Sequence, residues 1–155
     1  MLSPEYVVGL VDGEGCFYVN VRPKRPHTRR PHVETHFYLK LVEEDRHLLE
    51  EIKETFGCGR IYIQRDNRKN HRACCRYEVN SRKDIQKVII PFFKKYPLLS
   101  QERNDFRAFC RVVDITMSGR HKTPEGLEDI QRIKDRMNIK ARRVRKICSL
   151  GGNAK

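Results

Sequence analysis

Apolar and polar residues alternate in two parts of the chain, and each part predicts a pair of antiparallel strands. A period of two places successive side chains on opposite faces of a strand, so that one face can be buried and the other wet. The first pair is expected on either side of a basic connection that contains prolines, and the second on either side of a polar turn at residues 66–70. The residues predicted to point inward are Phe17, Val19, Val21, Phe37, Leu39, Leu41, Ile61, Ile63, Cys75, Tyr77 and Val79.

Helices with one apolar face are predicted before, between and after these strands. Residues 3–5, Ser-Pro-Glu, are typical of a helix start, because a serine oxygen caps free backbone N–H groups and proline fits the first helical position. This first helix is expected over residues 6–12. Further helices are predicted to start at Asp45, Ser81, Ser100 and Thr123.

The resulting order of elements, α-β-β-α-β-β-α-α-α, predicts an α+β fold. Two consecutive hairpins join into a four-stranded antiparallel sheet, and helices must cover its apolar face because only they have apolar stripes to offer. The αββαββα part would then leave the other face of the sheet bare. We expect one domain over residues 1–138 and a basic, flexible tail over 139–155, where the sequence loses its apolar period.

Positive charge is concentrated on the predicted strands and their connections. The chain has 33 Lys and Arg against 20 Asp and Glu, a formal net charge of +13. Residues 20–42 and 60–76 hold 12 basic and 2 acidic side chains, which accounts for +10 of that charge. A charge of this size indicates a polyanionic partner, nucleic acid first and an anionic membrane surface second.

Other features of the composition exclude whole classes of protein. No run of 18 apolar residues exists, so no segment is expected to span a bilayer. The N-terminus has no basic stretch followed by an apolar one, so a secretory signal is not expected. The 6 cysteines show no CxxC spacing, which favours free thiols in a reducing compartment over disulfides or zinc. We therefore expect an intracellular protein without a membrane partner.

The outward positions of the predicted sheet carry side chains that can read DNA. A two-stranded ribbon fits the major groove, where arginine suits guanine, asparagine or glutamine suits adenine, and glutamate can accept from cytosine. The alternative is an ordinary solvent-facing sheet, but charge of one sign favours nucleic acid. The predicted DNA-binding residues are Tyr18, Asn20, Arg22, Lys24, Arg29, Arg30, His36, Tyr38, Lys40, Arg60, Tyr62, Gln64, Arg72, Arg76, Glu78 and, in the tail, Lys140, Arg142 and Arg143.

The end of the first helix carries a candidate cation ligand. Glu14 lies between two glycines where the free carbonyls of the last turn also point, and these oxygens suit a hard cation such as Mg²⁺. Taken alone, this Asp-Gly-Glu-Gly stretch is more typical of a loop than of a metal site. Gly9 and Gly13 lie four residues apart on the helix. Glycine costs a helix about 1 kcal/mol relative to alanine, a cost that is tolerable where another helix approaches closely.

Residues 7–17, Val-Val-Gly-Leu-Val-Asp-Gly-Glu-Gly-Cys-Phe, resemble the motif that names the LAGLIDADG homing endonuclease family. Residues 43–59, 96–106 and 123–127 also resemble segments of that family, so the resemblance covers most of residues 3–138. Val-Val replaces the Leu-Ala of the motif, which leaves its packing role unchanged. Glu14 stands where aspartate is also common in the family.

The resemblance implies a site built from two copies of the motif helix. In the family these helices pack through small residues, so Val8, Gly9, Asp12 and Gly13 are expected at a dimer interface. Because the chain has one motif and no internal repeat, the second copy would come from a second chain. Such a homodimer would bind a long pseudo-palindromic DNA target and cleave both strands.

The resemblance also implies a catalytic role for the last acid of the motif. Glu14 and the carbonyl of Gly13 would hold a divalent cation, Mg²⁺ or Mn²⁺ or Ca²⁺ in its place, that activates water and stabilises the leaving oxygen. Glu43 stands where the family often has glutamine, and Arg103 follows Glu102, where the family often has a basic residue; Glu43 and Arg103 are candidate supporting catalytic residues. The alternative is a nuclease-inactive relative that acts as an RNA maturase or a DNA-binding repressor, which a cleavage assay with Mg²⁺ would separate.

Overall fold

The computed structural model describes residues 1–27, 30–65 and 72–138 of the 155-residue chain. Two short turns of 3₁₀ helix lie at Glu43–Asp45 and Arg120–Lys122, and one turn of π-helix lies at Ile85–Ile89. The helices and strands are α1 (Pro4–Glu14), β1 (Gly15–Arg22), β2 (His32–Val42), α2 (Arg46–Phe56), β3 (Arg60–Gln64), β4 (Cys74–Val79), α3 (Arg82–Asp84), α4 (Ile90–Lys95), α5 (Glu102–Met117) and α6 (Pro124–Asp135).

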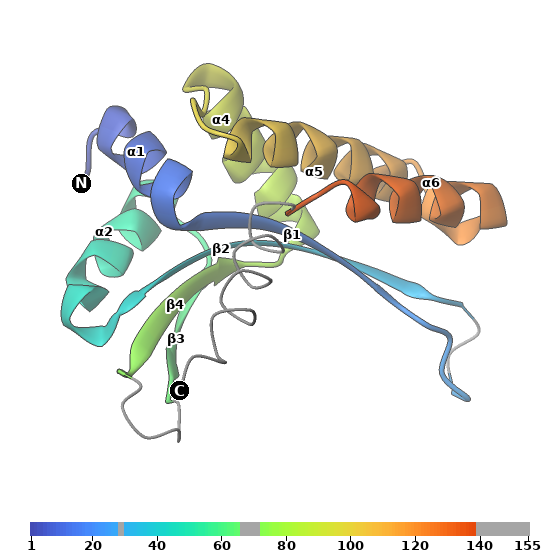
Figure 1. Ribbon diagram of the computed structural model, residues 1–155, viewed down its shortest axis with the longest axis horizontal. Coiled ribbons are helices and arrows are strands. Elements are labelled where there is room, and N and C mark those ends of the chain that lie inside the picture. The colour runs from blue at the N-terminus through green and yellow to red at the C-terminus, as the bar shows by residue number, and fades with distance from the viewer. Residues whose placement is uncertain (28–29, 66–71, 139–155) are drawn as a thin grey trace, which may run out of the picture.

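The four strands form one antiparallel sheet in the order β1-β2-β4-β3 (Figure 1). The two hairpins meet through β2 and β4, where Phe37 lies opposite Val79 and Lys40 lies opposite Arg76. Figure 1 shows the helices of the described residues on one side of this sheet and none of them on its other face. The predicted α+β fold with a four-stranded antiparallel sheet is therefore confirmed.

Aromatic rings form the centre of the core between the sheet and the helices. The ring of Phe17 on β1 lies 5.1–5.6 Å, centroid to centroid, from the rings of Phe37, Phe93, Phe106 and Phe109. All five side chains are buried, and burying one such side chain stabilises the fold by about 1.5–3 kcal/mol. These contacts hold α4 and α5 against the inner face of the sheet.

Most of the strand residues predicted to point inward are buried. Val21 and Leu41 are only partly buried, because they lie near the ends of β1 and β2. The inward residues with no more than 2% of their surface exposed are Phe17, Val19, Phe37, Leu39, Cys75, Tyr77 and Val79.

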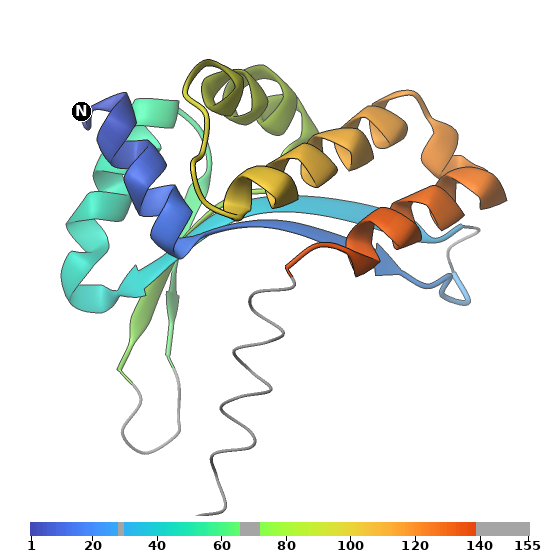
Figure 2. The same cartoon turned by 45° about the horizontal axis from the view of Figure 1, so that its top comes forward.

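Strand β3 does not follow the predicted burial. Ile63 is 45% exposed and Ile61 is only half-buried. β3 lies at the edge of the sheet, and Figure 2 shows the β3–β4 hairpin extending away from the helices. Ile63 has the predicted phase, since it lies opposite the buried Cys75, but it is exposed because no helix of the described residues packs over the end of this edge strand.

Three of the predicted helix starts are capped by their side chains. The hydroxyl oxygen of Ser3 accepts from the N–H of Tyr6 at 3.2 Å, and that of Ser81 accepts from the N–H of Asp84 at 3.3 Å. Thr123 caps α6 in the same way.

Of the other two predicted helix starts, Asp45 is confirmed as the N-cap position of α2, whereas Ser100 lies one residue before Gln101, the N-cap position of α5. A 3₁₀ turn over Glu43–Asp45 precedes α2, and the Asp45 side chain accepts no capping hydrogen bond from the described backbone. Ser100 lies two residues before α5, where its hydroxyl donates to the carboxylate of Asp12 at 2.7 Å. In both places the chain must change direction between a packed element and the helix.

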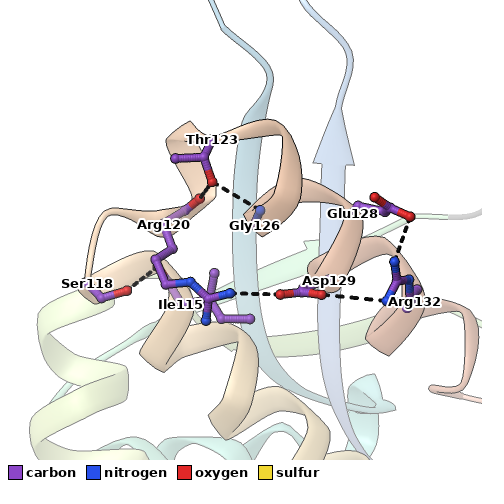
Figure 3. Close-up of polar contacts among 8 residues, drawn as sticks. All are labelled: Ile115, Ser118, Arg120, Thr123, Gly126, Glu128, Asp129 and Arg132. Atoms are coloured by element: carbon purple, nitrogen blue, oxygen red, sulfur yellow. Dashed lines mark hydrogen bonds and ion pairs between the residues drawn. The ribbon is translucent and has the colours of Figure 1, made fainter.

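Hydrogen bonds and ion pairs between residues close in sequence stabilise the connection between α5 and α6 (Figure 3). Arg120 pairs with Asp129 at 2.8 Å, and Thr123 donates to the carbonyl of Arg120 at 2.8 Å. Gly126 fits this turn only because it has no side chain, since an added Cβ would lie 1.9 Å from the carbonyl oxygen of Arg120. On the outer side of α6, Arg132 pairs with Glu128 at 2.6 Å.

Candidate active site and nucleic-acid interface

Glu14 is exposed at the last position of α1, where the helix passes directly into β1 (Figure 2). Gly15 makes this passage possible, because a Cβ at its position would lie 2.5 Å from Cγ1 of Val11 and 2.7 Å from its carbonyl oxygen. The N–H of Gly15 donates to the same carbonyl. The short connection therefore fixes the backbone of Glu14 at the junction between α1 and the sheet.

Asp12 is occupied within the chain. Its carboxylate accepts hydrogen bonds from the N–H groups of Leu99 and Ser100, at 3.0 and 3.1 Å, and from the hydroxyl of Ser100 at 2.7 Å. These contacts tie the end of α1 to the segment before α5. The structure thus gives Asp12 a contact inside one chain, and its expected place at a dimer interface stays a prediction.

One face of α1 is open. Gly9 and Gly13 are both exposed, and a Cβ added to either would meet nothing within 4 Å. Tyr6, which is 47% exposed, lies three residues before Gly9 on the same face. A second helix could therefore approach this face closely, and sequence reasoning missed Tyr6 as part of it.

Val8 does not belong to that open face. It is 8% exposed and lies with Val7 and Val11 in the chain's own core. The three valines form the inward stripe of α1, opposite to the glycines, because a helix turns 3.6 residues per turn. In this chain Val8 packs inward, and its place at an interface between chains stays a prediction.

The two supporting candidates lie in different surroundings. Glu43 is exposed four residues beyond Leu39, the partner of Gly15 across β1 and β2, which is roughly 13 Å along the strand. The supporting role of Glu43 beside Glu14 stays a prediction. Arg103 is exposed on the first turn of α5, close behind the segment that Asp12 ties to α1.

The outer face of the sheet carries a network of charged side chains that spans three strands. On β1 and β2, Oε2 of Glu34 accepts from Nδ2 of Asn20 at 3.3 Å, pairs with Nε of Arg22 at 2.9 Å and lies 3.8 Å from Nε2 of His36. The other ring nitrogen of His36, Nδ1, lies 2.5 Å from Oε1 of Glu78 on β4. Oε2 of Glu78 in turn pairs with Nε of Arg76 at 2.8 Å.

Arg76 also packs on an aromatic ring. Its guanidinium carbon lies 3.7 Å from the centroid of the Tyr38 ring. Burial raises the pKa of the Tyr38 phenol, and a hydrogen bond with Cys16 raises it further. Burial likewise raises the pKa of the Cys16 thiol, and the negative charges of the nearby Glu102 and Asp105 raise this pKa further. Tyr38 thus presents a neutral, fixed ring beneath Arg76.

The remaining predicted DNA-binding residues surround this network. Tyr18 is 38% exposed and Tyr62 is 43% exposed. Lys40 and Arg60 make no ion pair with any described residue. The other exposed candidates are Lys24, Arg30, Gln64 and Arg72, whereas Arg29, Lys140, Arg142 and Arg143 lie outside the described residues.

Two residues of this region were missed by sequence reasoning. Glu34 is the acid that joins Asn20, Arg22 and His36, and its place as the single acid in a basic strand segment could have marked it. Asn138 donates from its N–H to Asp105 at 3.1 Å and from Nδ2 to the carbonyl of Phe17 at 3.4 Å. These two hydrogen bonds connect the segment after α6 to α5 and β1, and no local sequence pattern predicted them.

The described residues contain no group of three or more His, Cys, Asp or Glu side chains that could hold a metal ion. The oxygens that one chain offers at the end of α1 are the Glu14 carboxylate and backbone carbonyls of the last helical turn. Within the same residues, no helix has the length and apolar character needed to cross a membrane.

A family model described as LAGLIDADG endonuclease matches residues 7–113, which include most of α1, the whole sheet and most of α5. The chain belongs to the LAGLIDADG endonuclease family. Its motif helix is α1, and the last acid of the motif, Glu14, is the exposed carboxylate at the junction with β1.

Two curated relatives are named as probable intron-encoded endonucleases. The chain is 31% identical over 130 residues to "Probable intron-encoded endonuclease 2" of Neurospora crassa, covering 83% of this chain and 28% of the relative. It is 32% identical over 139 residues to "Probable intron-encoded endonuclease 3" of the same organism, covering 89% and 25%. The chain thus spans about a quarter of the length of these curated relatives.

Solved homing endonucleases share the fold. The crystal structure of the homing endonuclease I-TnaI matches with a TM-score of 0.79 and 34% identity, over 88% of both chains. I-LtrWI bound to its target DNA matches with a TM-score of 0.79 and 33% identity, over 88% of this chain and 44% of that one. I-SmaMI, bound to uncleaved target DNA in the presence of calcium ions, matches at 0.77 and 29%, over 88% and 45%.

Proposed function

We propose that this protein is a site-specific double-strand DNA endonuclease, a homing endonuclease that binds a long pseudo-palindromic target as a homodimer. The bare, basic sheet face would lie in the major groove, since a twisted antiparallel ribbon fits that groove. The DNA complexes of I-LtrWI and I-SmaMI, which share this fold, support the proposal. The names of the fungal relatives support an intron-encoded protein that acts inside the cell.

The position of Glu14 carries the proposal. It is an exposed carboxylate that directly follows Gly13 on the open face of α1 and directly precedes the first strand of the sheet. If a second copy packs on Gly9 and Gly13 across a two-fold axis, the two Glu14 side chains come close to each other at that axis. The sheets of the two copies then extend to either side, each over half of the target.

The chemistry of the donor set fits a divalent cation such as Mg²⁺. Mg²⁺ prefers oxygen ligands, keeps several waters and binds through one or two carboxylates together with phosphate oxygens. The Glu14 carboxylate and the carbonyl of Gly13 would hold it, with the rest of its ligands coming from DNA and water. When bound, such a cation makes water a better nucleophile and stabilises the leaving oxygen. Arg103 and Glu43 remain candidates for contacting the phosphate and its water.

The test is cleavage of DNA selected from a randomised library. The wild type is expected to cut both strands of the selected duplex with Mg²⁺ and to stop when the metal is chelated. Glu14→Gln should abolish cleavage while keeping affinity, because its contacts are to metal and water rather than to base edges. Full cleavage by Glu14→Gln would refute the site. Binding without cleavage by the wild type would favour a maturase or a repressor.

The assembly has a separate test. Gly9→Leu places a bulky side chain on the open face of α1, where the wild type has nothing within 4 Å, so the monomer fold is expected to survive. The variant should stay monomeric in sedimentation with target DNA and lose double-strand cleavage. A wild type that stays monomeric on its target would refute the homodimer.

A further inference from the structure

Two carboxylates lie in the middle of the basic outer face, Glu34 on β2 and Glu78 on β4. A carboxylate beside DNA phosphates is repulsive, so a DNA-binding face would bind more tightly without them. Their side chains are only 19% and 13% exposed, because basic and aromatic neighbours from three strands enclose them. Their partners within the chain give the reason for their presence.

Each carboxylate holds an arginine that was predicted to read bases. Glu34 binds Arg22 and, through the same oxygen, Asn20. Nε of Arg76 lies 2.8 Å from Oε2 of Glu78, a charge contact without hydrogen-bond geometry, and the guanidinium packs on the ring of Tyr38. Both arginines are therefore held in defined orientations before any DNA arrives, which reduces the conformational entropy that binding must remove.

The two halves of the network are joined. His36 lies between the carboxylates, with Nδ1 2.5 Å from Glu78 and Nε2 3.8 Å from Glu34. The charges of the two arginines are balanced by the two glutamates, so this part of the face adds little to the general attraction for phosphate. Lys40 and Arg60 form no ion pair with any of the described carboxylates.

We infer that Glu34 and Glu78 are positioning residues for sequence recognition: they orient Arg22 and Arg76 toward base edges and prevent them from binding phosphates of any sequence. This inference rests on the proposed function of the sheet face. The centre of the face then supplies discrimination between sequences, and the unbalanced cations around it supply affinity.

The test uses Glu34→Gln and Glu78→Gln, which keep the side-chain size and remove the charge. Equilibrium binding is measured to the selected target and to a scrambled duplex of equal length over a series of salt concentrations. Each variant should bind the scrambled duplex more tightly, and the ratio of the two affinities should fall about tenfold, the value of one well-oriented base contact. The log–log salt slope for the scrambled duplex should steepen by about 0.9 for each released arginine.

Glu128→Gln is the matched control. It changes the total charge equally and removes a partner of Arg132 at 2.6 Å, but it lies on α6, away from the outer face of the sheet. The affinity ratio of this variant should equal that of the wild type. An equal loss of discrimination in Glu128→Gln and Glu34→Gln would overturn the inference, because total charge would then explain both.

A double-mutant cycle tests the positioning itself. Arg76→Gln should lower the affinity ratio in the wild type but change it little in Glu78→Gln, where Arg76 is already released. Equal effects in both backgrounds would overturn the inference. Should Glu78→Gln fail to show a cooperative unfolding transition, the same cycle with Arg22→Gln and Glu34→Gln decides it at the other end of the network.

The outcomes separate this inference from the function on which it rests. A wild type that prefers no sequence over the scrambled duplex refutes the proposed endonuclease function. A wild type that discriminates and cleaves, together with glutamine variants that discriminate equally well, refutes only the positioning role.

Discussion

Arginine–carboxylate pairs occur in two regions of this molecule and differ in their exposure to solvent. At the connection of α5 and α6, Arg132 and Glu128 are four residues apart on one helix, and each is 66% exposed. On the outer face of the sheet, Arg76 and Glu78 are 23% and 13% exposed and are joined through His36 to Glu34 on another strand. Both pairs are local in sequence, but the first is exposed to solvent, whereas the second is partly enclosed and linked through His36 to a neighbouring strand.

The difference shows why similar pairs have different consequences. Exposed pairs contribute about 0.2–1 kcal/mol, since water competes with them and the side chains lose entropy. A partly enclosed charge loses solvation, so removing one partner leaves the other poorly compensated. The sheet holds the backbones of the partners in register, so the pairs there also fix directions. We expect the helical region to affect stability alone and the sheet region to affect recognition.

The largest effect on stability is expected from Gly126→Ala in the helical region. The new Cβ would lie 1.9 Å from the carbonyl oxygen of Arg120, so the turn must move. The free energy of unfolding, measured in urea, should fall by about 2–4 kcal/mol, in the range of backbone and overpacking defects. Ser118→Ala in the same connection is the control and should change it by less than about 1 kcal/mol. If Gly126→Ala discriminates between DNA sequences as the wild type does, the helical region affects stability alone, as expected. Altered discrimination by this variant would contradict that expectation.

The next effect is expected from Arg76→Ala in the sheet region. Binding to the selected target should weaken by about 1–3 kcal/mol, and the preference at particular base pairs should relax. Lys40→Ala, directly opposite across β2 and β4, is the matched control. It should weaken binding to all duplexes alike and reduce the salt slope by about 0.9. If both variants lowered all affinities equally, Arg76 would be a phosphate contact and not a reader.

A smaller effect on stability is expected from Asp105→Asn in α5, the helix that joins the sheet region to the helical region. Asp105 on α5 is buried, and burial raises its pKa above the ordinary value of 3.8. The unfolded carboxyl therefore ionises at a lower pH than the folded one. Relative to Asp105→Asn, the wild type should lose stability as the pH rises from below 3.8 through the raised pKa. Urea unfolding of both proteins across this range measures the difference, and a difference independent of pH would contradict the burial of a titrating carboxyl here.

The smallest effect is expected from Arg132→Ala. Its contacts with Glu128 and Asp129 are local and exposed, so the free energy of unfolding should change by no more than about 0.5 kcal/mol. Sequence discrimination should equal that of the wild type. A loss above 1 kcal/mol, on the order of a buried pair, would remove the contrast between the two regions.

Much of the fold followed from local patterns. The alternation around Phe17, Phe37 and Tyr77 gave the inward phase of three strands, because neighbouring side chains on a strand point to opposite faces. The alternation did not predict that Ile63 is exposed, because alternation describes the two faces of a strand and not which elements pack over them. The resemblance to the LAGLIDADG motif identified Glu14 and the open glycines of α1 but also assigned Val8 and Asp12 to an interface. Only the tertiary structure shows that Val8 packs with the other valines of α1 and that Asp12 binds Ser100, and their place at an interface stays a prediction.

By itself, the sequence determined which residues lie on the two faces of the strands, where the positive charge is concentrated and which acid ends the motif helix. These properties depend on neighbours a few positions apart, where backbone geometry repeats with a fixed period. Only the tertiary structure decided that β2 lies beside β4, which brings His36 to Glu78 across 42 positions of the chain, and that Asn138 reaches Phe17 across 121. Contacts between such distant residues arise from the packing of whole elements, and no period along the chain records that packing.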